Sequence, residues 1–193
     1  VTFEIKKYHH KAIKTELKAF HAKRFVSKNP RHCIRIPWLN EIFPEAKYIL
    51  IWRDHKSVIN SSYQKMKEEW DMKFRFPFKN FKGHKSIVEK FGDGSKFDAC
   101  IKYYQYQRDI LEKDKLIIKD RLIEMEYSEL IKEPETALKK LYKFTELEWY
   151  KELESSFPDR LEQFNDNKWK KLPKDKRDIL EKIDYSNTGD DNG

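Results

Sequence analysis

The stretch that decides the fold is Lys47-Tyr48-Ile49-Leu50-Ile51-Trp52, and Arg53-Asp54 follows it directly. The apolar run is unbroken and lies between polar flanks, a pattern typical of a strand buried on both faces, as in a parallel sheet. Apolar residues then recur at helical spacing from about Lys56 to Trp70. We therefore expect an interior strand that ends at Arg53 and a helix that begins almost at once.

Strands and helices alternate along most of the chain. Besides the run above, strands are predicted over Arg24–Lys28 and Leu122–Tyr127. The predicted helices have apolar residues at helical spacing and cover Phe3–Lys23, Ile34–Phe43, Phe97–Lys113, Glu133–Phe144, Glu148–Phe164 and Lys174–Ile183. This alternation predicts an α/β fold with a parallel sheet flanked by helices. The 193 residues fit a single domain over residues 1–183 and a flexible tail over residues 184–193.

An irregular insertion is predicted from Met72 to Lys96. Four phenylalanines lie among lysines between Phe74 and Phe81, and a Gly-Asp-Gly-Ser sequence follows. Long irregular insertions in compact domains are often lids or binding loops. From the residues alone, the phenylalanines fit the lining of an acceptor pocket and the packing of a core equally well.

Composition excludes several classes of protein. Lys and Arg number 41 against 33 Asp and Glu, a net charge of +8, but 15% aromatic residues argue against disorder. Cys33 and Cys100 are too few for a disulfide framework and lack metal-ligand spacing, so we expect reduced thiols and a cytoplasmic location. Five glycines cannot supply a Walker loop or a G-x-G-x-x-G fingerprint. No apolar run approaches about 18 residues, so no membrane span is expected in this chain.

Side chains suited to a nucleotide follow the predicted strands. The first strand ends at Lys28, the second at Arg53 and the third at Tyr127. Because ligands of open α/β sheets lie outside the carboxyl ends of the strands, we expect these side chains at one rim. The two cations suit phosphate groups, the ring suits a base, and the N–H groups that open the next helix favour an anion. Taken singly, each residue fits a surface ion pair or ordinary packing better than a ligand contact.

Three blocks of sequence carry a family resemblance. The first contains Lys28-Asn29-Pro30-Arg31, Arg35-Ile36, Leu39, Glu41-Ile42-Phe43-Pro44-Glu45-Ala46-Lys47-Tyr48-Ile49, and Arg53-Asp54 through Val58 to Ser61. The second runs from Arg121 to Leu130 with Pro134 beyond it, and the third is Asn167-Lys168-Trp169-Lys170-Lys171-Leu172. Together they resemble sulfotransferases that use 3′-phosphoadenosine 5′-phosphosulfate (PAPS). In that family a strand is entered through "FP-acid-A" and ends in Arg, and a Ser follows eight residues later.

The resemblance implies a P-loop-transferase-like architecture and places the nucleotide. It assigns Arg53 and Ser61 to the 3′-phosphate and Tyr127 to a position beside the nucleotide. Arg suits this phosphate because it binds in a bidentate manner. The third block resembles the basic, aromatic segment that closes over the 3′-phosphate end, which assigns three further residues to the nucleotide: Lys168, Trp169 and Lys170.

The resemblance also assigns a catalytic role to Lys28, which matches a lysine that stabilises the transition state in members of the family. Sulfuryl transfer depends mainly on positioning and electrostatic stabilisation. It requires no metal where cations of the protein neutralise the developing charge. We therefore expect PAPS as co-substrate and no metal ion.

Two features depart from the family pattern. Members begin with a strand and a phosphosulfate loop of the type "P-R/K-S-G-T/S", and this chain has no such motif. The resemblance thus implies a fold truncated at its N-terminus, which makes activity of this chain alone uncertain. In addition, Asp54-His55-Lys56 replaces the common Asn/Asp-Pro after the Arg. Because the residue before a proline is kept out of the helical region, we expect a small shift in the start of the helix.

The function that follows is sulfuryl transfer from PAPS to a hydroxyl or amine of a small molecule or glycan. The alternative is a non-catalytic module that binds a nucleotide or anion on the same fold. A third reading, a basic nucleic-acid-binding protein, ranks last because the basic residues are spread among acids, so no nucleic-acid partner is expected. The identity of the acceptor cannot be read from the sequence, and a homo-oligomer is left open.

Overall fold

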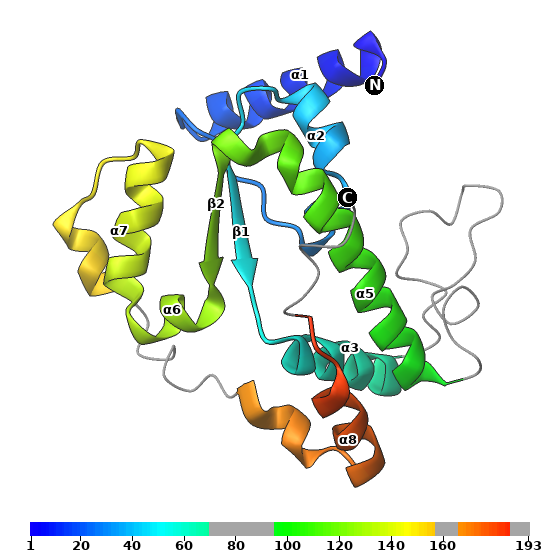
Figure 1. Ribbon diagram of the computed structural model, residues 1–193. Helices are drawn as coiled ribbons and strands as arrows, with labels where there is room; N and C mark the ends of the chain where they lie inside the picture. The colour runs from blue at the N-terminus through cyan, green and yellow to red at the C-terminus, as the bar shows by residue number, and fades with distance from the viewer. Residues whose placement is uncertain (70–94, 157–165, 186–193) are drawn as a thin grey trace. The chain divides into compact units, whose positions relative to one another are not determined.

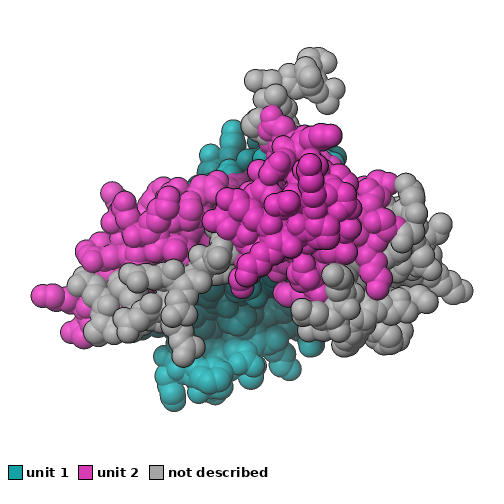
Figure 2. All heavy atoms as spheres, turned by 90° about the horizontal axis from the view of Figure 1, so that it is seen from below, with its two compact units in different colours: residues 1–50, 106–124 teal, residues 51–105, 125–193 magenta. Residues whose placement is uncertain are grey.

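The computed structural model describes residues 1–69, 95–156 and 166–185. The chain forms two compact units, which are coloured separately in Figure 2. Unit 1 contains residues 1–50 and 106–124, and unit 2 contains residues 51–105 and 125–193. Each unit is described below by itself.

The sheet of the described chain has two parallel strands, β1 (Tyr48–Trp52) and β2 (Leu122–Glu126), and both contribute residues to each unit (Figure 1). A helix follows each strand, which confirms the α/β character predicted from the sequence. β1 pairs with β2, the strand that precedes Tyr127. Burial of β1 on both faces is wrong for the described structure. Ile49 and Ile51 are each 43% exposed, because β2 is the one strand paired with β1 and a single face of this ribbon is covered.

The strand predicted over Arg24–Lys28 is also wrong. These residues have no regular secondary structure, and all five side chains are exposed. A strand is stable only when a neighbour accepts and donates its backbone hydrogen bonds, and neither described strand pairs with this segment. Its end is nevertheless well defined, because the Asn29 side chain accepts a hydrogen bond from Arg31 N and opens the 3-10 helix η1 (Pro30–Ile34).

Unit 1 contains α1 (Phe3–Ala19), η1, α2 (Ile36–Ile42) and η3 (Lys115–Arg121), with the second half of α5 (Lys96–Asp114). Its buried side chains include Ile36, Ile42 and Ile118, which come from α2 and η3. Arg121 fixes the turn that leads into β1. Its Nη1 donates to the Ala46 carbonyl oxygen at 2.8 Å, and its Nη2 donates to Asn40 Oδ1. The turn Phe43-Pro44-Glu45-Ala46, which matches the "FP-acid-A" pattern, is therefore held by the Arg121 guanidinium. Arg121 lies 75 residues after Ala46 in the chain.

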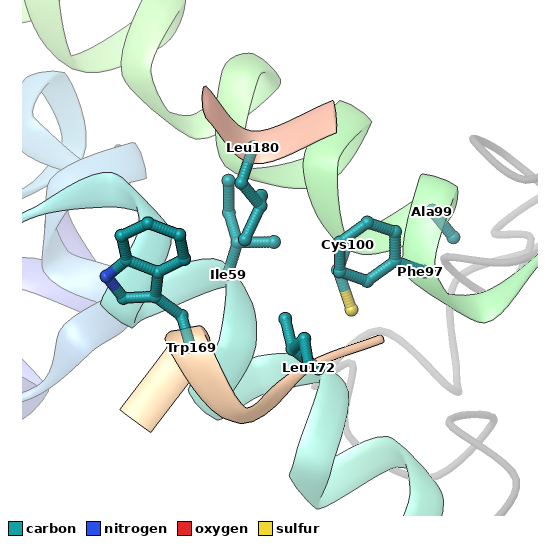
Figure 3. Packing of buried hydrophobic residues seen from close by; sticks show 7 residues of the cluster. All are labelled: Ile59, Phe97, Ala99, Cys100, Trp169, Leu172 and Leu180. Carbon is teal, nitrogen blue, oxygen red and sulfur yellow. The ribbon is translucent and has the colours of Figure 1, made fainter. Parts of the chain in front are cut away.

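Unit 2 contains α3 (His55–Glu69), α6 (Tyr127–Lys132), α7 (Pro134–Thr145), η4 (Lys151–Ser156), η6 (Asp166–Lys171) and α8 (Lys174–Lys182), with the first half of α5. Its core joins α3, α5, η6 and α8. The cluster of buried side chains, drawn in Figure 3, consists of Ile59, Phe97, Ala99, Cys100, Trp169, Leu172 and Leu180. This core fixes η6 against α3.

Most predicted helices are confirmed within about four residues, namely those that became α1, α2, α3, α5, α7 and α8. The helix predicted over Glu148–Phe164 is wrong where it is described, since residues 151–156 form the 3-10 helix η4, and its later part lies outside the described residues. The insertion from Met72 to Lys96, with its phenylalanines, lies almost wholly outside them too. Among the described helices, none combines the length and the apolar character needed to cross a bilayer.

Candidate functional site

Arg53 lies in the two-residue link between β1 and α3. Asp54 caps the helix that follows. Its Oδ2 accepts a hydrogen bond from Ser57 N at 2.9 Å, and its carbonyl oxygen accepts one from Val58 N at 3.1 Å. The helix therefore begins at His55 without the proline of the family pattern, and its start is adjacent to the Arg53 backbone.

Tyr127 occupies the equivalent place after β2, as the first residue of α6. The start of α6 is fixed by a capping box, in which Glu126 and Glu129 satisfy each other's backbone N–H groups. Because the two strands are parallel neighbours, their ends meet, and Arg53 Cζ lies 5.4 Å from the centre of the Tyr127 ring. The structure thus brings together two of the residues predicted to bind the nucleotide.

A second cationic cluster lies between α3 and η6 in unit 2. Lys56 Nζ lies 5.0 Å from the centre of the Trp169 ring, and Lys170 Nζ lies 5.9 Å from it. Lys56, in the first turn of α3, is a residue that the sequence analysis missed. The signal for it was its place three residues after Arg53, at a helix start, where a cation and the helix N–H groups favour the same anion.

Trp169 serves first as the anchor of η6. Its side chain is 7% exposed and packs in the cluster with Ile59 and Leu172 (Figure 3). The next residue of η6 is held as well, because Arg177 Nη1 of α8 donates a hydrogen bond to the Lys170 carbonyl oxygen at 3.4 Å. The segment Lys168-Trp169-Lys170 is therefore held by a buried ring at its centre, with an exposed lysine on each side.

Ser61 and Lys28 take no part in these contacts. Ser61 is half-buried on α3, five residues after Lys56, so the two side chains leave the helix about 140° apart. Ser61 instead shares a helix face with Ser57, which is 5% exposed. Lys28 belongs to unit 1, where it is exposed in the irregular segment before η1.

His55 stands after Asp54, where the family pattern has a proline. Its ring packs edge-on against Tyr185, with ring centres 4.9 Å apart, and Tyr185 in turn contacts Tyr104 at 5.2 Å. Tyr185, which the sequence analysis assigned to the flexible tail, is 7% exposed. His55, in the position of the proline, thus packs against Tyr185, the last residue that the structure describes.

Chemically, the site supplies cations and aromatic rings. Arg53, Lys56, Lys168 and Lys170 all belong to unit 2 and suit a multiply charged phosphate. Tyr127 is half-buried and offers a ring, whereas the Trp169 ring is buried in the core. Within residues 1–69, 95–156 and 166–185, no group of three or more His, Cys, Asp or Glu is arranged to hold a metal ion.

Comparison with known proteins gives a family and two relatives. The model of the sulfotransferase family matches residues 4–151. Two curated proteins, each named omega-hydroxy-beta-dihydromenaquinone-9 sulfotransferase Stf3, come from Mycobacterium bovis and Mycobacterium tuberculosis. Each is 30% identical over 126 residues, which is 62% of this chain but 28% of the relative's length. No solved structure gives a significant match.

Proposed function

This chain belongs to the sulfotransferase family, and from that premise we infer that it transfers a sulfuryl group from PAPS to a hydroxyl or amine acceptor. The proposal includes the P-loop-transferase-like architecture of the family and a single domain over residues 1–183. The observation that carries it is the meeting of Arg53 and Tyr127 at the carboxyl ends of two parallel strands. In an α/β fold this is the edge at which ligands bind.

The donor set fits the 3′-phosphoadenosine part of PAPS. Arg53 would donate paired N–H groups to the 3′-phosphate, with a hydroxyl from Ser61. The exposed lysines on either side of Trp169 would add charge at the same end, and Lys56 would add a further cation from the first turn of α3. Tyr127 would lie beside the nucleotide. Its ring face would also hold the Arg53 guanidinium in place by the cation–π contact.

The chemistry assigned to the protein is mainly positioning and charge. When bound, PAPS supplies an activated sulfuryl group with a nucleotide phosphate as its leaving group. Lys28 would supply a cation to the charge that develops in transfer, a role that rests on its match to the family motif. Arg53 and the lysines of η6 would keep the nucleotide fixed while the acceptor oxygen or nitrogen approaches in line.

The acceptor class is supported by the relatives. Their name gives a hydroxylated dihydromenaquinone as substrate, so their acceptor group is a hydroxyl. We carry over only the hydroxyl, and keep an amine as the second acceptor class.

Calorimetry with 3′-phosphoadenosine 5′-phosphate and adenosine 5′-phosphate tests the nucleotide part of the proposal. The 3′-phosphate adds at least one charge-assisted hydrogen bond, so we expect it to raise affinity by roughly ten- to a hundred-fold. Equal affinities would contradict the proposal, since they would leave the cations of unit 2 without a phosphate to recognise.

The transfer step needs a separate test, because a non-catalytic module would also bind the nucleotide. Release of 3′-phosphoadenosine 5′-phosphate from PAPS would be followed in the presence of long-chain alcohols or amines. The comparison is made in protein that includes a phosphosulfate loop, since this chain has none. There we expect Lys28→Ala to reduce the rate by roughly a hundredfold or more while nucleotide affinity stays unchanged. Tight binding together with no release in either protein would then favour the non-catalytic module.

A further inference from the structure

The positive charge of the chain is concentrated in its first 28 residues. They contain eight Lys and Arg against two Glu, a formal charge of +6. The rest of the chain contains 33 Lys and Arg against 31 Asp and Glu, a formal charge of only +2. Most of the net charge of +8 therefore belongs to α1 and the segment that follows it, and the charge is less evenly spread than the composition suggests.

Four lysines of α1 form one row. Lys7, Lys11, Lys14 and Lys18 are spaced four, three and four residues apart, which places them on one face of the helix, here called the lysine face. All four side chains are exposed. No ion pair in the described part of the chain engages any of them.

A different face of α1 packs onto α2 and the turn after it, within unit 1 (Figure 1). His9 lies edge-on to Trp38 with ring centres 5.1 Å apart, and His10 Nε2 donates to the Ile42 carbonyl oxygen at 2.8 Å. Ile13 and Leu17 are half-buried on this side, one and two turns further along. Because these contacts fix the rotation of α1, the lysine face is directed away from them.

Exposed apolar side chains flank the lysine face. Phe3, 73% exposed, lies one turn before Lys7, and Tyr8, 70% exposed, lies one turn before Lys11. Exposed apolar residues are also dense in this region, since seven of the fifteen large ones in the described chain lie within residues 1–26. A basic row bordered by exposed rings is typical of helices that lie in a membrane interface.

We propose that the lysine face of α1 docks on an anionic membrane surface, with Phe3 and Tyr8 entering the headgroup region beside it. Each lysine near such a surface strengthens binding by roughly fivefold, so four in one row give a strong and salt-sensitive attraction. The rings distinguish a membrane from a nucleic acid or another soluble polyanion, because only the membrane offers an apolar layer beneath its charges. This inference rests on α1 alone and is independent of the proposed function.

Co-sedimentation of the full chain with lipid vesicles tests the proposal. We expect binding to phosphatidylcholine vesicles that contain about a third phosphatidylserine, weakened by salt, and little binding to pure phosphatidylcholine. The variant K7Q/K11Q/K14Q/K18Q should bind the anionic vesicles about a hundredfold or more weakly. Its matched control, K140Q/K143Q/K174Q/K182Q, loses the same charge from exposed lysines of α7 and α8 and should stay within about threefold of the parent.

A second pair of substitutions separates a membrane from a soluble polyanion. F3S/Y8S keeps every charge, and we expect it to bind anionic vesicles roughly tenfold more weakly with the same salt dependence. Unchanged vesicle binding by F3S/Y8S, or tighter binding of the parent to duplex DNA or heparin than to vesicles, would overturn the proposal. Equal losses in the two lysine variants would overturn it too, because net charge and not the lysine face would then explain binding. Circular dichroism confirms that each variant is folded.

Discussion

The segments around Arg53 and Lys28 were both predicted to end a strand at a ligand-binding edge, and the structure forms them differently. Arg53 follows a strand that is paired with β2, is succeeded by a capped helix, and lies over the ring of Tyr127. Lys28 lies in an exposed segment without a strand, although the next residue caps η1. The contrast shows that a β-like run becomes a strand only where a partner strand and a covering face are available.

The largest expected loss of stability comes from the core of unit 2, the unit that contains Arg53. Trp169→Ala leaves a cavity in the core of unit 2, so we expect the free energy of unfolding to fall by about 3–5 kcal/mol. Trp169→Phe keeps most of the ring and should cost much less. Urea unfolding followed by circular dichroism measures both. A loss below about 1 kcal/mol in Trp169→Ala would mean that the ring is not the anchor of η6.

A smaller loss of stability is expected in unit 1, where Arg121 holds the turn that precedes β1. Arg121→Met removes the hydrogen bonds to Ala46 and Asn40, and we expect a loss of about 2–4 kcal/mol in the free energy of unfolding. Arg108→Met is the matched control, because that guanidinium pairs with Glu112 at 3.7 Å in a partly exposed ion pair and should cost less than about 1 kcal/mol. Similar losses in the two variants would show that the turn into β1 does not depend on Arg121.

The next effect is the pH dependence of stability, because each unit contains one cysteine. Burial raises the pKa of Cys100 in the unit 2 core from 9.0 to about 12. Above pH 9 the thiolate forms more readily in the unfolded chain. The free energy of unfolding should therefore be unaffected below about pH 9 and fall as pH rises towards 12, by at most about 1.4 kcal/mol per pH unit.

Chemical denaturation at several pH values checks this titration. Cys100→Ala should lose less stability between pH 9 and 11 than the parent, because it has no thiol to ionise. Cys33→Ala is the comparison in unit 1, where the half-buried thiol donates to the Pro30 carbonyl oxygen at 2.9 Å. Burial raises the pKa of Cys33 too, so this variant should also lose less stability than the parent. Parallel curves for Cys100→Ala and the parent would refute the assignment of the alkaline loss to Cys100.

The parts of the fold and site that could be predicted are those encoded locally. The run before Arg53 and the helix after it occupy one continuous stretch, so periodicity and the family motif identified them together. The contact between Lys56 and Trp169 joins residues more than a hundred positions apart, which periodicity cannot reveal. The strand expected before Lys28 failed for a similar reason, because its formation depends on a partner that no local pattern specifies.

The claim at the centre of this account is that Arg53 recognises a 3′-phosphate, and nucleotide selectivity tests it most directly. Calorimetry would compare 3′-phosphoadenosine 5′-phosphate with adenosine 5′-phosphate for the parent, Arg53→Ala and the unit 1 control Arg108→Ala. We expect Arg53→Ala to weaken the first nucleotide by roughly ten- to a hundred-fold and the second little, while Arg108→Ala leaves the ratio unchanged. Equal weakening towards both nucleotides in Arg53→Ala, or none towards either, would contradict the claim.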